Sequence, residues 1–236
     1  MSIKKKIVLK IGGSVMYDEN LDINFSLLHK VKNWYERVKS EYSKIIFVVG
    51  GGKLSRQLQK KMGDSIKDQH SLHSVAMSVT QTNASLLSAV LADRSIFVPQ
   101  KLGDAYEFLI DENTHTLVSG GLKVGWSTDM DASIFADIIS TDRVIKISDI
   151  DYLYDKDPHE FPDAQVIKEI SWGEYFKLFD ITEESQHQPN KSVPVDKECA
   201  LFSSKKMISF FICGGKNLFQ KENIEDIISE GTLVYP

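Results

Sequence analysis

The sequence predicts an α/β fold built around a mainly parallel sheet, and three observations lead to this class. Short apolar runs typical of buried strands recur along the 236 residues. Between them lie stretches in which apolar residues fall three or four positions apart, the spacing of one helix face. Glycine-rich turns follow several of the apolar runs. Strands that alternate with helices along the chain are typical of an α/β domain with a mainly parallel sheet.

The predicted elements follow one another along the chain. Strands are expected at residues 6–11, 44–49, 95–99, 115–119, 143–148 and 207–213. Helices are expected at residues 24–42, 53–61, 71–94 and 127–142. The first helix would bury one apolar face, made of Phe25, Leu28, Val31, Tyr35 and Val38. Thr128 is the predicted N-cap of the last helix, with Asp131 three residues on as in a capping box.

Two stretches predict irregular structure in the second half of the chain. Residues 151–164 are rich in Asp, Pro and Tyr, which is typical of a surface loop, and residues 180–197 are polar with two prolines. Neither stretch resembles a linker between independent units. We therefore expect one domain over residues 1–236.

Composition excludes several classes of protein. A net charge of −5 with 42% hydrophobic residues indicates no general affinity for nucleic acid or anionic membranes. The short apolar run near the N-terminus leads directly into glycines, so we expect a first strand rather than a signal peptide, and a cytoplasmic protein. Cys199 and Cys213 fit no metal or redox spacing and are expected as buried thiols. His70 and His73 lie one helical turn apart without further ligands nearby, so no metal site is predicted.

Glycines gather where the predicted strands end. The turns hold Gly12, Gly13 and Ser14 after the first strand, Gly50, Gly51 and Gly52 after the second, and Gly120, Gly121 and Gly125 after the fourth. In parallel sheets these ends meet at one edge, where ligands bind. Backbone amides of such turns and helix N-termini bind anions. The three turns therefore predict a polyanionic ligand, although no phosphate-binding P-loop motif occurs.

Four segments carry a family resemblance. The segments "KIGGS", "VVGGGKLSR", "GWSTDMDA" and "SDIDYLYDKDPHEFPDA" resemble, in order and spacing, those of the amino acid kinase family, and most of all its archaeal-type uridylate (UMP) kinases. The resemblance covers essentially the whole chain. It implies a three-layer α/β/α sandwich and transfer of the γ-phosphoryl group of ATP, with Mg²⁺, to a phosphate or carboxylate acceptor, with UMP as the best single candidate.

The resemblance also implies residue roles. Lys10 would neutralise the transferring phosphoryl group, and Asp129 would orient that lysine. The implied ATP-binding residues are Gly12, Gly13, Ser14, Gly52, Arg56, Ser148, Tyr154 and Asp157. The implied acceptor-binding residues are Gly51, His73, Gly121, Lys123, Gly125, Trp126 and Thr128. It further implies a homo-oligomer, formed partly through the helix that follows the first strand.

The chain departs from the family pattern mainly on the acceptor side. His73 stands where the subfamily has an aspartate that holds the UMP ribose, and Tyr152 replaces a glycine. Leu122, Lys123, Val124 and Trp126 replace much of the usual acceptor loop. Three other functions therefore remain open at this point: a kinase for another small anion, a nucleotide-binding or storage protein without turnover, and a dinucleotide-binding domain. Retention of both Lys10 and Asp129 argues against the storage protein, and the incomplete glycine pattern argues against the dinucleotide domain.

Overall fold

A computed structural model describes residues 5–18, 20–156, 161–182, 193–215 and 230–236. Its seven-stranded sheet has the order β3-β2-β1-β4-β8-β9-β7. All neighbouring strands in it are parallel except β8 and β9, which are antiparallel. The strands are β1 (Lys5–Ile11), β2 (Tyr42–Val49), β3 (Thr116–Ser119), β4 (Arg143–Ser148), β7 (Glu169–Ser171), β8 (Ser209–Gly214) and β9 (Gly231–Tyr235).

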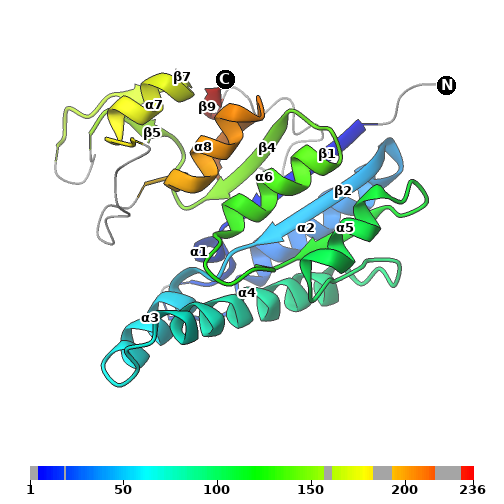
Figure 1. The fold of residues 1–236 in the computed structure, drawn as a ribbon. Helices are drawn as coiled ribbons and strands as arrows, with labels where there is room; N and C mark the ends of the chain where they lie inside the picture. Colours follow the sequence, from blue (N-terminus) through cyan, green and yellow to red (C-terminus); the bar gives the residue numbers. More distant parts are fainter. Residues whose placement is uncertain (1–4, 19, 157–160, 183–192, 216–229) are drawn as a thin grey trace.

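Helices cover both faces of this sheet. They are α1 (Gly13–Met16), α2 (Phe25–Val38), α3 (Gly52–Gly63), α4 (Gln69–Leu91), α5 (Leu102–Ile110), α6 (Thr128–Ile138), α7 (Trp172–Leu178) and α8 (Lys197–Lys205), with a 3-10 turn, η1 (Lys39–Glu41), after α2. Figure 1 shows α6 and α8 crossing the near face of the sheet, with α2 behind it. The expected three-layer α/β/α sandwich is confirmed.

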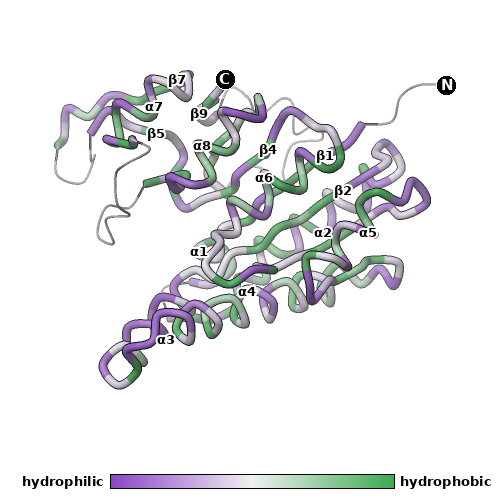
Figure 2. The backbone as a smooth tube through the Cα atoms, in the orientation of Figure 1, coloured by the Kyte–Doolittle hydropathy of each residue, from purple (hydrophilic) through white to green (hydrophobic). Residues whose placement is uncertain are grey.

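The strand pleat divides the core into two clusters, one on each face. Leu9 and Ile11 of β1 pack with residues of α2 and α4, whereas Val8 packs with residues of α6 and α8. Successive side chains of a strand point to opposite faces, so a buried strand feeds both clusters. Figure 2 shows the central strands as largely hydrophobic, and α3 as a mostly hydrophilic helix that projects from the sandwich.

Some sequence expectations need correction. Residues 95–99 form no strand of the sheet; Phe97 makes a single parallel bridge to Leu117 of β3. Pro99 has no amide hydrogen, so it cannot continue that ladder. Within the expected loop at residues 151–164, β5 (Leu153–Tyr154) pairs with β6 (Val166–Ile167) in a separate two-stranded sheet. Of the second expected loop, residues 183–192 lie outside the described residues.

Two side-chain predictions on the helices are also wrong. Ser127, not Thr128, is the N-cap of α6, because its side chain accepts the amide of Met130. Phe25, the first residue of α2, is 49% exposed, while Leu28, Val31, Tyr35 and Val38 are buried as expected. Cys199 and Cys213 are free and buried, as predicted.

Candidate active site

The glycine turns after β1 and β2 interlock at the carboxyl edge of the sheet. A Cβ added to Gly13 would lie 2.3 Å from the amide nitrogen of Gly52, and Gly52 has φ +61°. Only glycine allows this approach and this backbone conformation without strain. The third turn lies close against α4, because a Cβ on Gly120 would be 2.5 Å from the amide nitrogen of Gln81. The N-termini of α1 and α3 therefore lie next to each other at this edge of the sheet.

A buried asparagine holds the second glycine turn. The side-chain amide of Asn83, on α4, donates to the carbonyl of Gly50 at 2.8 Å and accepts from the Tyr17 hydroxyl at 2.6 Å. Asn83 is fully buried. Its two hydrogen bonds connect α4, the turn after β2 and the end of α1. Sequence reasoning assigned Asn83 no role.

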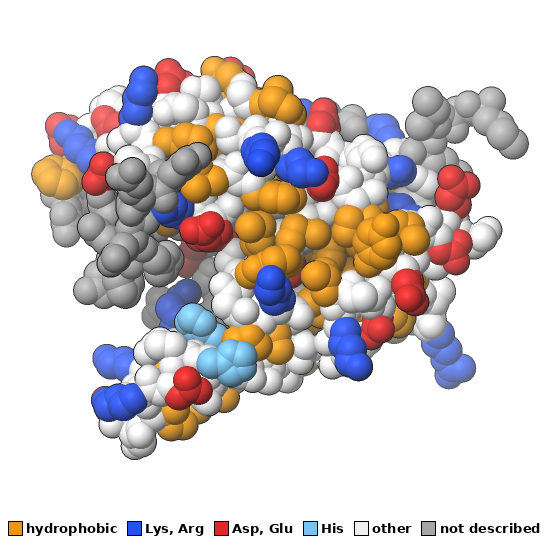
Figure 3. Space-filling view, in the orientation of Figure 1, with side chains coloured by type: hydrophobic (Ala, Val, Ile, Leu, Met, Phe, Trp, Pro, Cys, Tyr) orange, Lys and Arg blue, Asp and Glu red, His pale blue; other side chains and the backbone are white. Residues whose placement is uncertain are grey.

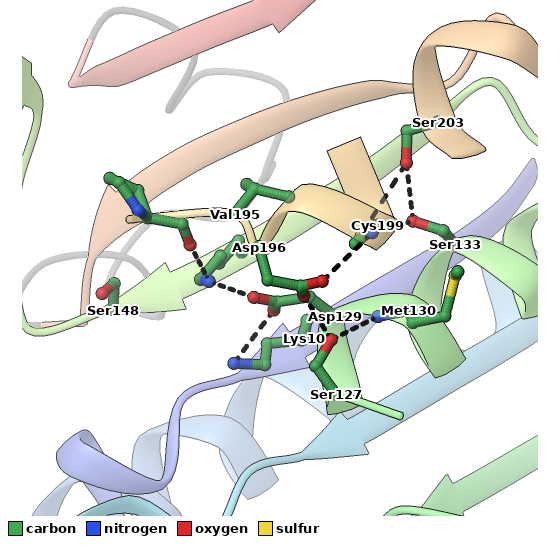
Figure 4. A network of polar contacts seen from close by, with 12 residues as sticks. Lys10, Ser127, Asp129, Met130, Ser133, Ser148, Val195, Asp196, Cys199 and Ser203 are labelled. Atoms are coloured by element: carbon green, nitrogen blue, oxygen red, sulfur yellow. Dashed lines mark hydrogen bonds and ion pairs between the residues drawn. The ribbon is translucent and has the colours of Figure 1, made fainter. Parts of the chain in front are cut away.

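Two lysines and one aspartate form the charged centre of this edge (Figure 4). Lys10 Nζ lies 3.0 Å from Asp129 Oδ1, and Lys146 Nζ lies 2.5 Å from Asp129 Oδ2. Lys10 of β1 and Lys146 of β4 are register partners on neighbouring parallel strands. Both side chains therefore leave the sheet on the α6 face, where Asp129 occupies the first turn of α6.

Lys146 is the member of this charged centre that sequence reasoning did not single out. A lysine inside the otherwise apolar run "RVIKIS" was a usable signal, because a lysine within a buried strand needs a charged or polar partner. Lys10 in "KIVLKI" carries the same signal.

Burial and charge shift the titration of this centre in defined directions. Burial lowers the pKa of Lys10, and the nearby Lys146 lowers it further, while the Asp129 carboxylate opposes both. Burial alone would raise the pKa of Asp129, but the charges of Lys10 and Lys146 outweigh it and hold the pKa below its ordinary value. Two ammonium groups around one carboxylate leave a net positive charge, which attracts an anion.

The centre is connected to the segment that leads into α8. Lys146 Nζ also donates to the carbonyl of Pro194. The Tyr175 hydroxyl donates to the carbonyl of Val195 and accepts from its amide, both at 2.8 Å. Asp196 accepts from the Ser127 hydroxyl at 2.5 Å and from the amide of Cys199 at 3.1 Å, so it joins the N-termini of α6 and α8 (Figure 4). Sequence reasoning predicted none of these contacts.

A cleft of about 550 Å³ opens beside the centre, and we call it the α3–α4 cleft. It is lined by Ser55, Gln59, His73, Ala76, Met77, Thr80, Gly121, Lys123, Gly125, Trp126, Ser127, Thr128, Asp196 and Glu198. Six of the seven expected acceptor residues are among them. Gly51, the seventh, packs against Ser55, to whose Cβ an added Cβ would approach within 2.5 Å. Figure 3 shows histidine side chains at the corner of α3 and α4. Within the cleft, Lys123 Nζ lies 4.1 Å from the Trp126 ring centroid.

A second cleft, of about 350 Å³, lies between α1, the start of α2 and the ends of β4 and β8, and we call it the α1–α2 cleft. Ser14 and Ser148, two expected ATP residues, line it together. The amide of Gly12 donates to the carbonyl of Ile147 at 2.8 Å, which joins the first glycine turn to the end of β4. Arg56 of α3 and Tyr154 of β5 line neither cleft. Asp157 lies outside the described residues.

Among the described residues, no group of three or more His, Cys, Asp or Glu side chains is placed to hold a metal ion. No helix in the described part is both long and apolar enough to cross a membrane.

Comparison with known proteins agrees with this architecture. The model of the amino acid kinase family matches residues 5–214. A uridylate kinase of Thermococcus onnurineus is 30% identical over 233 residues, which cover 98% of this chain and 100% of that protein. A uridylate kinase of Thermococcus kodakarensis is also 30% identical, over 238 residues, with 98% and 100% covered.

Solved structures share the fold. The uridylate kinase of Archaeoglobus fulgidus has a TM-score of 0.75 and 22% identity, and the match covers 98% of this chain and 100% of that one. The UMP kinase of Bacillus anthracis also has a TM-score of 0.75, at 17% identity, with 98% and 96% covered. The chain belongs to the amino acid kinase family, and it is a phosphotransferase.

Proposed function

We propose that this chain transfers the γ-phosphoryl group of ATP to UMP. The observation that carries the proposal is the position of the Lys10–Asp129–Lys146 centre at the carboxyl edge of the sheet, beside the α3–α4 cleft and next to the glycine turn that borders the α1–α2 cleft. The full-length similarity to archaeal proteins named uridylate kinase supports UMP as the acceptor.

In this proposal ATP lies with its phosphates over the glycine turns. The free amides at the starts of α1 and α3 bind phosphate oxygens, and Ser14 and Ser148 contact the rest of the donor in the α1–α2 cleft. Arg56, Tyr154 and Asp157 complete the proposed donor site. Gly51 and Gly52 then separate donor from acceptor.

The two lysines neutralise charge on the group in transfer. Phosphoryl transfer spreads negative charge over the equatorial oxygens, so positioning and electrostatic stabilisation supply most of the catalysis. Lys10 and Lys146 are held in place by Asp129 and need no reorganisation when the charge develops. Asp129 takes no proton in this scheme, because its lowered pKa keeps it ionised near neutral pH.

Mg²⁺ is proposed to enter with the nucleotide. The described side chains provide no cluster for a metal ion, and Mg²⁺ in kinases is commonly held by substrate phosphates with one or two protein oxygens. It would add charge neutralisation on the phosphates. The protein's own residues, and not the metal ion, position ATP and the acceptor in this proposal.

Two further properties are proposed. The free, buried thiols of Cys199 and Cys213 fit a reducing compartment, and we propose the cytoplasm. The exposed Phe25 of α2 supports a homo-oligomer in which this helix contributes to the interface. Light scattering on the purified protein tests the association.

A coupled assay with ATP, Mg²⁺ and a panel of nucleoside monophosphates and small carboxylic acids tests the function. We expect turnover with UMP above that with CMP, AMP and GMP. ATP with Mg²⁺ should also raise the melting temperature by mass action. Efficient turnover of another acceptor, with none of UMP, would contradict the proposal.

A further inference from the structure

The α3–α4 cleft contains charged and imidazole side chains that have no hydrogen-bond or ion-pair partner among the described residues. They come from three different parts of the fold: His73 from α4, Lys123 from the loop before α6, and Glu198 from α8. Lys123 is positioned by the Trp126 ring, with its ammonium 4.1 Å from the centroid. His73 and Glu198 remain available to a ligand.

The two carboxylates of the cleft, those of Asp196 and Glu198, differ in whether they already accept hydrogen bonds from the protein. Asp196 uses one oxygen to accept from Ser127 and the other to accept from the amide of Cys199. Those contacts keep Asp196 in a structural role between two helices. Glu198, two residues further along, is exposed on the first turn of α8. It is the carboxylate of this cleft that a ligand can reach.

The α3–α4 cleft extends from the charged centre to solvent. Thr128 is the direct sequence neighbour of Asp129, so it marks the end of the cleft next to the centre. His73, Lys123 and Glu198 also line the cleft, and all three are exposed. An acceptor whose phosphate reaches Lys10 can therefore place its remaining part against these three side chains.

Chemistry restricts what an exposed carboxylate in this cleft can bind. An ionised carboxylate only accepts hydrogen bonds, and it can accept two at once. Adjacent sugar hydroxyls are paired donors, and an acidic side chain is the common partner of ribose hydroxyls in nucleotide sites. An imidazole ring in its neutral form accepts only one hydrogen bond.

We propose that Glu198 binds the sugar hydroxyls of the acceptor and makes this enzyme selective for ribonucleotides over 2′-deoxyribonucleotides. This inference rests on the proposed function and assigns to α8 the sugar recognition that His73 cannot provide alone. A purely structural Glu198 would only complement the helix dipole of α8, an effect that does not distinguish between acceptors.

The experiment compares UMP with its 2′-deoxy analogue, dUMP, in the intact protein. Glu198→Gln keeps the size and helix propensity of the side chain but removes its charge. Glu107→Gln, on the exposed face of α5 and outside both clefts, is the matched control. For each form kcat/KM is measured with both nucleotides, and unfolding curves show that the variants are folded.

We expect the wild-type enzyme to prefer UMP over dUMP by on the order of tenfold or more, the range of a charged hydrogen bond. Glu198→Gln should lower kcat/KM for UMP more than that for dUMP, which lacks the 2′-hydroxyl and keeps only the 3′-hydroxyl, so the preference falls toward unity. Glu107→Gln should keep the wild-type preference. Adding His73→Asp to Glu198→Gln should restore it, since a carboxylate returns to the cleft.

A Glu198→Gln variant that keeps the wild-type preference, or that loses activity equally on both nucleotides, overturns the inference. If the wild-type protein phosphorylates neither nucleotide, calorimetric titration separates the two proposals. Tighter binding of UMP than dUMP that depends on Glu198 would support the sugar site and contradict only the kinase function. Absence of binding would overturn both.

Discussion

The backbones of Gly13 and Gly52 are in direct contact where β1 and β2 end. A Cβ on Gly52 would lie 2.2 Å from the carbonyl carbon of Gly13, far inside van der Waals contact. Gly13 is the first residue of α1 and Gly52 the first of α3. The contact therefore brings two helix N-termini to one point, where their unpaired amides can bind the same polyanion.

Gly52→Ala should disrupt this contact. The added methyl group meets the backbone of Gly13, and φ +61° is unfavourable for alanine, so we expect at least about 2 kcal/mol of destabilisation and weaker ATP binding. Gly103→Ala is the matched control: nothing lies within 4 Å of its Cβ position in α5, and alanine there should stabilise by about 0.5–1 kcal/mol. Urea unfolding and ATP titration measure both. Equal stability of the two variants would contradict the packing argument.

Lys10→Ala should lower kcat by on the order of 10²–10³-fold or more, because it removes a preorganised positive charge from the transfer site. Stability should change little, since Asp129 keeps its ion pair with Lys146 and a buried ammonium is costly to desolvate. Lys206→Ala, which breaks an exposed ion pair with Asp137, is the control and should leave kcat unchanged. Turnover of Lys10→Ala within a few fold of wild type would remove Lys10 from the catalytic centre.

Comparison of Lys146→Met with Tyr175→Phe separates the effect of the Lys146 charge from that of tethering the segment before α8. The substitution removes both the ion pair to Asp129 and the hydrogen bond to Pro194, while it keeps an unbranched side chain of similar length. We expect kcat to fall at least about tenfold. Tyr175→Phe loosens the same segment at Val195 but leaves Asp129 untouched, so its effect on kcat should be smaller. Amide exchange at Val195 reports the loosening, and equal losses of kcat would indicate that Lys146 acts only as a tether.

Asp131 gives the protein a pH-dependent stability. Its carboxyl group is fully buried on α6, behind Gly121, and burial raises its pKa to about 7, against a smaller lowering by the backbone of Leu122. The folded state therefore keeps a proton that the unfolded chain loses above about pH 4. This contribution falls as pH rises from about 4 to about 7, and it is constant above and below that window.

Asp131→Asn removes this titration. Relative to wild type, the variant should gain on the order of 3 kcal/mol between pH 4 and pH 8. Urea unfolding at several pH values measures the difference, with Asp104→Asn on exposed α5 as the control. A difference between Asp131→Asn and wild type that does not vary with pH would show that the fold does not raise the pKa of Asp131.

His73→Asp should improve the use of UMP. A carboxylate in the α3–α4 cleft adds a charged acceptor for the sugar hydroxyls, which we expect to raise kcat/KM by up to about tenfold. His70→Asp, one helical turn earlier and outside the cleft, is the control. If wild type already uses UMP efficiently and His73→Asp changes nothing, the acceptor side is complete as it stands.

Much of the fold could be predicted from local patterns. The runs that became β1, β2, β4 and β8 are almost continuously apolar because each is buried on both faces. Residues 95–99 have a similar composition, yet they lie at the sheet edge and form only one bridge. Apolar composition reports burial, whereas strand pairing depends on which neighbour the chain meets and on the missing amide of Pro99.

The candidate site likewise contains some residues that the sequence could single out and others that it could not. Gly13, Gly52 and Lys10 could be singled out from sequence because glycine runs and a lysine in a buried strand are unusual wherever they occur. The partner of Lys10 across β1 and β4 depends on strand order, and Lys146 became visible only when those strands lay side by side in register. Glu198 has no local signal at all.

The sequence by itself determined the alternation of strands and helices, the glycine turns and the lysine before the first turn, because these depend on backbone freedom and burial within a few residues. Only the tertiary structure decided which lysine shares Asp129 with Lys10, and which carboxylates line the same cleft as His73. Lys10 and Lys146 are 136 positions apart in sequence number. Their pairing depends on parallel register and on the packing of α6 and α8 over the sheet, which no local pattern specifies.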